Sequence, residues 1–161
     1  MTLQIRLAVD READSIAGIL AEAFQEFKPA YTPEAYSATT PSGDQISARF
    51  REGPIWVAVD GEELIGTISA VPRDGEVYIR SLAVLSSARG KGTAKALLEA
   101  AEAYAAETGF SRLTLCTTPF LLHAIRLYEQ SGYRHTGEGL DDLFGTPLIC
   151  MSKPLDSPVQ N

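Results

Sequence analysis

The chain has 161 residues, a formal net charge of −7, and 45% hydrophobic residues. This length fits one compact domain of about 100–200 residues, which can bury a core without a disulfide or metal staple. The negative charge argues against nucleic acid as the main partner, because phosphate binding needs clustered lysine and arginine.

No apolar run approaches the roughly 20 residues that span a bilayer, so no membrane partner is expected. The first residues, from Met1 to Arg6, lack the apolar core of a secretory signal. The sequence therefore predicts a cytoplasmic protein. Cys116 and Cys150 lie far apart, each within an apolar run. Free buried thiols are the expectation for a cytosolic chain, with a disulfide between them left open.

Hydrophobic spacing in the first half changes between the helical and the strand period. The predicted elements are a strand at 5–8, a helix at 11–27, a looser proline-rich region, a helix at 44–52, and strands at 55–59, 64–71 and 76–84. Asp60-Gly61 and the segment from Pro72 to Gly75 are turn signals between these last three strands. Three antiparallel strands are therefore expected.

The second half continues with a helical face from Ala94 to Ala105, which ends near Gly109. A strand at 113–116, a helical stripe from Ala124 to Ser131, and strands at 133–136 and 148–151 follow. The order βααβββαβαββ predicts a mixed α/β domain over residues 1–153, with a flexible tail at 154–161.

A glycine-rich turn joins the strand at 76–84 to the next helix, with the sequence Arg89-Gly90-Lys91-Gly92-Thr93-Ala94. Free backbone N–H groups and the positive end of a helix dipole meet there, which is typical of an anion site. The Walker loop requires a glycine where Leu85 stands. The dinucleotide fingerprint requires a small residue at Lys95, so it fails as well.

The turn resembles the acetyl-CoA loop of the GNAT (Gcn5-related) N-acetyltransferase superfamily, Arg/Gln-x-x-Gly-x-Gly/Ala, at Arg89, Gly92 and Ala94. Leu82-Ala83-Val84 resembles the end of that superfamily's fourth strand, and Ala124-x-x-Leu127-Tyr128-x-x-x-Gly132-Tyr133 resembles its last helix. The order of elements is also similar throughout. The resemblance implies a mixed, mostly antiparallel sheet that splays between its fourth and fifth strands.

The same resemblance implies acetyl-CoA as co-substrate, no metal, and compatibility with a homodimer. Main-chain amides of the loop would hold the pyrophosphate, and the pantetheine arm would pair with the fourth strand in the splay. Thr93 and Lys95 would add side-chain contacts. The cofactor-binding residues implied in this way are Leu82, Ala83, Val84, Arg89, Gly90, Lys91, Gly92, Thr93, Ala94 and Lys95.

Acetyl transfer needs an oxyanion donor, implied in the main chain near Leu82, and a general acid, implied at Tyr128. Glu76 is a candidate base only through a water relay, since about 20 Å of strand separates it from Leu82. Many relatives carry an asparagine where Leu121 stands. This departure keeps open a non-catalytic CoA-binding sensor or scaffold module, and an enzyme for a longer acyl-CoA.

Strand alternation predicts that Glu76, Tyr78, Arg80, Leu82 and Val84 share one face of the sheet, opposite Val77, Ile79, Ser81 and Ala83. Arg80 would then lie about 7 Å along the strand from the reacting region, where it could hold an anion on the acceptor. An ion pair of Arg80 with Glu22 or Asp142 is the competing interpretation. Tyr78, Phe27 and Tyr31 are further candidates for the acceptor side. The expected reaction is acetyl transfer to a primary amine of a small molecule or amino acid.

Overall fold

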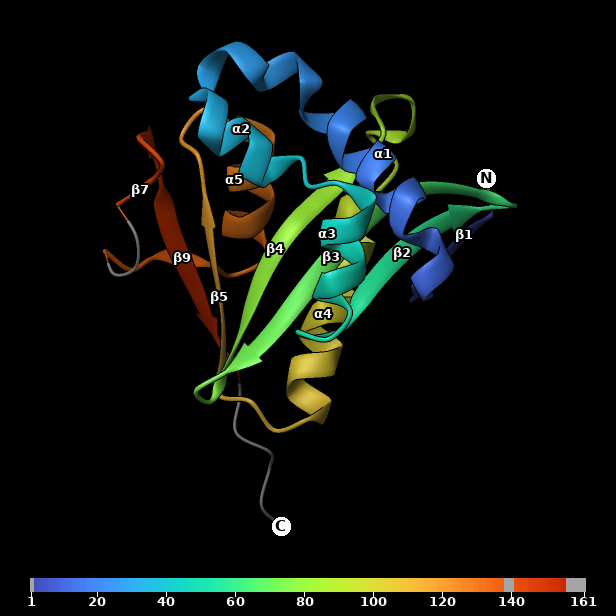
Figure 1. Cartoon of the computed structure of the whole chain (residues 1–161). Coiled ribbons are helices and arrows are strands. Elements are labelled where there is room, and N and C mark those ends of the chain that lie inside the picture. The colour runs from blue at the N-terminus through green and yellow to red at the C-terminus, as the bar shows by residue number, and fades with distance from the viewer. Residues whose placement is uncertain (1, 138–140, 156–161) are drawn as a thin grey trace.

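Seven strands form one mixed sheet in the computed structural model, which describes residues 2–137 and 141–155 (Figure 1). The strand order is β1-β2-β3-β4-β5-β9-β6, and only the β4–β5 pair is parallel. The strands are β1 (Leu3–Leu7), β2 (Ile55–Asp60), β3 (Glu63–Arg73), β4 (Glu76–Val84), β5 (Arg112–Thr117), β6 (Arg134–His135) and β9 (Ile149–Pro154). The expected mixed, mostly antiparallel sheet is confirmed.

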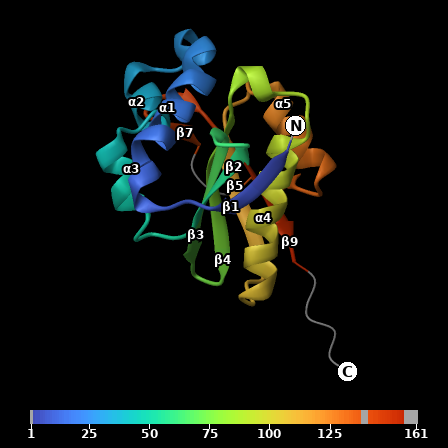
Figure 2. The ribbon, with the colours of Figure 1, turned by 90° about the vertical axis from the view of Figure 1, so that its right-hand side faces the viewer.

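Helices cover both faces of this sheet, as Figure 2 shows, with α1, α2 and α3 on one side and α4 and α5 on the other. The α-helices are α1 (Ala13–Phe24), α2 (Pro33–Thr39), α3 (Gly43–Arg49), α4 (Thr93–Glu107) and α5 (Leu122–Gln130). Short 3-10 turns η1 (Asp10–Glu12), η2 (Gln25–Ala30) and η3 (Ser86–Ala88) flank them. Each face buries its own apolar cluster, one under α4 and one under α1 and α3.

Two elements were not expected from the sequence. The proline-rich region folds into α2, because the Thr32 hydroxyl accepts a hydrogen bond from the Ala35 N–H and Pro33 occupies the first turn. A small hairpin of β7 (Asp142–Leu143) and β8 (Thr146–Pro147) forms a second sheet. Thr32 holds this hairpin, since its N–H donates to Thr146 Oγ1 at 2.9 Å and its hydroxyl to the Phe144 carbonyl at 2.8 Å.

The expectation of free thiols is wrong. Cys116 and Cys150 form a disulfide, which joins β5 to β9. The two residues are direct partners in the antiparallel register of these strands, with their Cα atoms 4.0 Å apart. Sequence separation concealed this proximity, because the two cysteines become neighbours only when the last long strand pairs with β5.

The C-terminal strand β9 extends through Pro154, one residue past the predicted domain boundary, and residues 156–161 of the predicted tail lie outside the described residues. Within the described part of the chain, every helix is too short or too polar to cross a membrane.

Candidate active site

The phosphate-loop prediction rests on the segment between β4 and α4. Gly90 and Gly92 both have φ near +80°, and Gly92 caps the first turn of α4. Among the described residues, no acceptor is found for the N–H groups of residues 90–95, and the first helical hydrogen bond runs from Ala96 N–H to the Gly92 carbonyl. A Cβ atom built on either glycine would meet no atom within 4 Å. These open donors at the positive end of a 15-residue helix fit a pyrophosphate.

Side chains of the loop divide between structural and open roles. The Arg89 guanidinium donates to Glu26 Oε1 at 2.6 Å and to the Ala23 carbonyl at 3.1 Å, so it ties the loop to the end of α1. Thr93 is 2% exposed, and its hydroxyl has no partner among the described residues. Lys91 and Lys95 are exposed, and their contacts with a bound phosphate stay a prediction.

A β-bulge in β4 changes the predicted arrangement of this strand. Ser81 has φ +57°, and the register with β3 shifts between the Ser69–Arg80 pair and the Thr67–Ala83 pair. A bulge inserts one extra residue, which reverses the alternation of side chains beyond it. The prediction of one continuous face is therefore wrong.

Burial shows how the faces divide. Val84 belongs to the buried cluster under α4 together with Val77 and Ile79, and Leu82 packs against the same cluster. Ala83 belongs to the opposite cluster under α1. Side chains of Leu82 and Val84 therefore do not continue the face of Glu76, Tyr78 and Arg80, although the main chain of β4 keeps its expected path.

The sheet splays where a pantetheine arm is expected. Parallel pairing of β4 with β5 covers only Glu76–Ile79 and Arg112–Leu115. Beyond this point Ala83 and Val84 pair with β3 alone among the described residues. The edge of β4 that faces β5 therefore keeps open main-chain groups next to the phosphate loop, and an extended ligand can pair with them in the manner of an added strand.

Tyr128 on α5 is 7% exposed and lies in the cluster under α4, with its ring 5.8 Å from that of Tyr133. Burial, and secondly the neighbouring Tyr78, raises the pKa of Tyr128 well above its ordinary value. A phenol is protonated at neutral pH with or without this shift, and the higher pKa makes it a weaker proton donor, so the proposed acid role rests on the position of Tyr128 on α5. Leu121, which stands where many relatives carry an asparagine, is the N-cap of α5. Its side chain makes no capping hydrogen bond.

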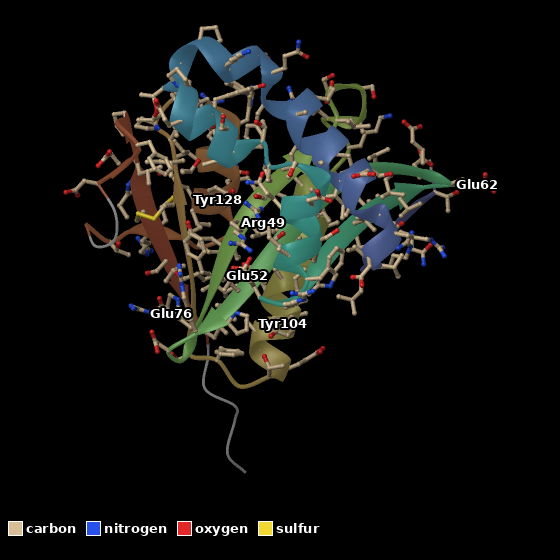
Figure 3. The ribbon with its side chains drawn as sticks, in the orientation of Figure 1. Arg49, Glu52, Glu62, Glu76, Tyr104 and Tyr128 are labelled. Carbon is tan, nitrogen blue, oxygen red and sulfur yellow. A yellow bond between two sulfur atoms is a disulfide. The ribbon has the colours of Figure 1, made fainter. Side chains whose placement is uncertain are left out.

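Glu76, the candidate base, forms an ion pair at the start of β4. Its carboxylate forms an ion pair at 2.5 Å with Arg112 Nε on β5. Figure 3 shows Glu76 at the hairpin end of β4, apart from Tyr128. This ion pair gives Glu76 a structural role at the start of β4, and its role as a water-relay base stays a prediction. Groups of three or more histidine, cysteine or acidic residues able to hold a metal are not found in the described part of the chain.

The aromatic candidates from the first half form a cluster that sequence reasoning identified only in part. Tyr31 is buried and packs edge-on against Phe120, with ring centroids 4.9 Å apart, and Phe27 lies 6.0 Å from the same ring. Phe120, in the β5–α5 connection, was not predicted. A cavity of about 450 Å³ adjoins this cluster and is lined by Lys28, Tyr31, Pro33, Tyr36, Ser37 and Thr40.

Arg80 forms an ion pair with neither predicted partner. Its Nη2 lies 2.7 Å from Glu52 Oε1, just after α3. Glu22 instead accepts hydrogen bonds from Ser86, and Asp142 accepts one from the Gly145 N–H. Beside this pair, Arg49 at the end of α3 donates to Ser81 Oγ at 2.8 Å. Neither Arg49 nor Glu52 was predicted, because their contacts with Ser81 and Arg80 join segments about 30 residues apart in the sequence.

Comparison with known proteins agrees with this geometry. Residues 15–133 match the family described as Acetyltransferase (GNAT) family. N-acetyltransferase 8B of Homo sapiens is 34% identical over 89 residues, which are 52% of this chain and 39% of that protein. N-acetylaspartate synthetase of Danio rerio is 39% identical over 88 residues, 53% of this chain and 31% of that protein.

The chain thus matches about a third to two fifths of the length of these two relatives. Among solved structures, the PaiA N-acetyltransferase of Thermoplasma acidophilum in complex with coenzyme A has a TM-score of 0.83 at 16% identity, covering 96% of this chain and 100% of that one. This similarity concerns the fold. Because the family match covers most of the sequence and the loop, splay and helix order agree with it, the chain belongs to the GNAT acetyltransferase family.

Proposed function

We propose that this protein transfers an acetyl group from acetyl-CoA directly to a primary amine of a small molecule or amino acid. The observation that carries the proposal is the continuity of two open features. The unpaired edge of β4 beyond Ile79 leads into the acceptor-free N–H groups of residues 90–95. An extended arm that ends in a pyrophosphate matches both features, and coenzyme A has this shape.

The chain's own groups supply what the reaction requires. Acetyl-CoA provides the activated thioester, which a neutral amine attacks. A main-chain N–H near Leu82, on the open edge of β4, would stabilise the oxyanion. Tyr128, a phenol that is protonated at neutral pH, would donate a proton to the departing thiolate. The amine loses its proton to solvent, since Glu76 is engaged by Arg112.

The acceptor class is supported by the relatives and by charge. One relative is named N-acetylaspartate synthetase, which makes an amino acid a candidate acceptor here. The net charge of −7 is compatible with a small substrate that enters a locally basic site. We expect the amine to be neutral when it attacks, so activity should rise with pH as the amine loses its proton.

A non-catalytic CoA-binding module is the second candidate, favoured by Leu121 at the start of α5 and by the engagement of Glu76. A longer acyl donor is the third. The purified chain would be incubated with acetyl-CoA, or with propionyl- and butyryl-CoA, and with amino acids, polyamines and aminoglycosides. Amine-dependent release of CoA thiol, with the acylated product identified by mass, supports the enzyme and names the acyl chain. CoA binding without thiol release would establish the module instead.

A further inference from the structure

Two arginines from different elements lie side by side on the α3 face of β4, and Figure 3 shows Arg49 and Glu52 there. Arg49 Nη1 donates to Ser81 Oγ at 2.8 Å, and Arg80 Nη2 to Glu52 Oε1 at 2.7 Å. A third guanidinium, that of Arg73, lies 4.3 Å from the centre of the Tyr78 ring. The charges of Arg73, Arg80 and Arg49 all act on Tyr78, in a chain whose net charge is −7.

The charges of this cluster are not balanced by its own acids. Among the described residues, Glu52 is the carboxylate that acts on Arg49, against the like charge of Arg80. The Glu52 side chain is 48% exposed, whereas that of Arg80 is 24% exposed and its Nε is buried without a partner among the described residues. Burial first, and then the charge of Arg80, lowers the pKa of Arg49 to about 10. Two half-buried like charges with an unused donor favour the arrival of an anion.

The cluster also lies next to the expected reaction centre. Arg49 binds the side chain of Ser81, the bulge residue that directly precedes Leu82. Arg80 is two residues from Leu82, on the other side of the Ser81 bulge. An acceptor whose amine is a few bonds from an acid group could therefore place the amine at the thioester and the acid between the two guanidinium groups.

We propose that Arg49 and Arg80 form a binding site for the acid group of the acceptor, and that Arg49 is a specificity-determining residue. This inference rests on the proposed acetyl transfer and specifies its substrate class as amines that carry a carboxylate or a similar anion. Arginine suits this role because its planar fork binds both oxygens of a carboxylate. Glu52 would release Arg80 as the acceptor binds, since about half of its own side chain is already exposed to solvent.

If these arginines bind the acid group of the acceptor, their loss should affect only acidic acceptors. If their role is purely structural, it should affect all acceptors alike. A pair of matched acceptors therefore distinguishes the two roles. Aspartate and asparaginamide, its diamide, share a skeleton and a primary amine, but only aspartate carries acid groups. Initial rates would be measured at saturating acetyl-CoA for the parent chain, Arg49→Gln, Arg80→Gln and Arg49→Lys. Arg51→Gln is the control, because it removes the same charge from an exposed position two residues away. Urea unfolding would confirm that each variant folds.

The parent should prefer aspartate in kcat/KM. Arg49→Gln and Arg80→Gln should each lower that value about 10- to 100-fold, mainly through KM, the loss expected for a hydrogen bond to a charged group. The value for asparaginamide should change little, and Arg49→Lys should recover part of the loss. Arg51→Gln should behave as the parent. Equal losses for both acceptors would mean that Arg49 merely supports the bulge, and a parent that prefers asparaginamide or spermidine would refute the site.

A second measurement is independent of catalysis. Succinate has two carboxylates and no amine, so its binding in the presence of CoA reports the anion site alone. Calorimetry should show succinate binding to the parent and to Arg51→Gln, and its loss in Arg49→Gln and Arg80→Gln. If no amine is acetylated while succinate binds in this pattern, the proposed function fails and the anion site stands. Absent or equal binding in all proteins would refute the site, whatever the outcome of the acetylation assay.

Discussion

Gly92 offers a direct test of the phosphate loop, because a glycine with a similar backbone conformation, Gly109, lies at the other end of the same helix. Gly92 precedes α4 with φ +80°, and Gly109 follows it with φ +83°. At both positions an added Cβ would meet no atom within 4 Å. Gly92→Ala and Gly109→Ala therefore impose the same backbone cost and no internal clash, while only Gly92 adjoins the open N–H groups of residues 90–95.

The expected magnitudes follow from this comparison. An L-residue in the left-handed region costs about 1–2 kcal/mol, so both variants should lose about that much unfolding free energy. In Gly92→Ala the methyl group would enter the space where the N–H groups meet a pyrophosphate. Losing one charge-assisted hydrogen bond there should weaken CoA binding about 10- to 100-fold.

Urea unfolding and calorimetric titration with CoA would measure the two effects on the same preparations. Gly109→Ala should bind CoA as the parent does, which separates a local effect at the loop from general destabilisation. Parental CoA affinity in both variants would refute the assignment of the loop. A fall in affinity in both would attribute the effect to α4 as a whole.

Tyr128→Phe should lower turnover about 10²–10⁴-fold with CoA affinity retained, because the ring stays packed and only the proton donor is lost; parental turnover would assign the acid to another group. Reduction of the Cys116–Cys150 disulfide, whose cysteines are 34 residues apart, should lower the unfolding free energy by about 4 kcal/mol. Two titratable thiols in protein that was never reduced would contradict that bond. The bidentate pair with Arg6 lowers the pKa of Glu12 below its usual 4.5, so this pair should stabilise the fold above pH 4.5 and lose that effect as the pH falls through the lowered value. In Glu12→Gln, the unfolding free energy should no longer include this pH-dependent contribution. An unfolding free energy with the same pH dependence as the parent's would show that the pair contributes nothing.

Local patterns in the sequence were sufficient for much of the fold and for the glycine turn that precedes α4, whose phosphate-binding role stays a prediction. The Asp60-Gly61 turn and two-residue periodicity predicted the hairpins of β2, β3 and β4, and all of them are present. The loop from Arg89 to Ala94 was identified because glycine spacing and a following helix are features of adjacent residues. Interactions between neighbours in the chain leave a readable signature, so these elements could be predicted.

Other features depended on packing between distant segments. Alternation along β4 was predicted correctly up to Arg80 and wrongly beyond it, because a bulge at Ser81 reverses the faces and depends on pairing with β3. The partner of Arg80 is Glu52 instead of Glu22 or Asp142, since the placement of α3 decides which carboxylate reaches the strand. Cys116 meets Cys150 only through the β5–β9 register. Such contacts are set by the three-dimensional arrangement of elements, and a periodicity within one element carries no information about its neighbours.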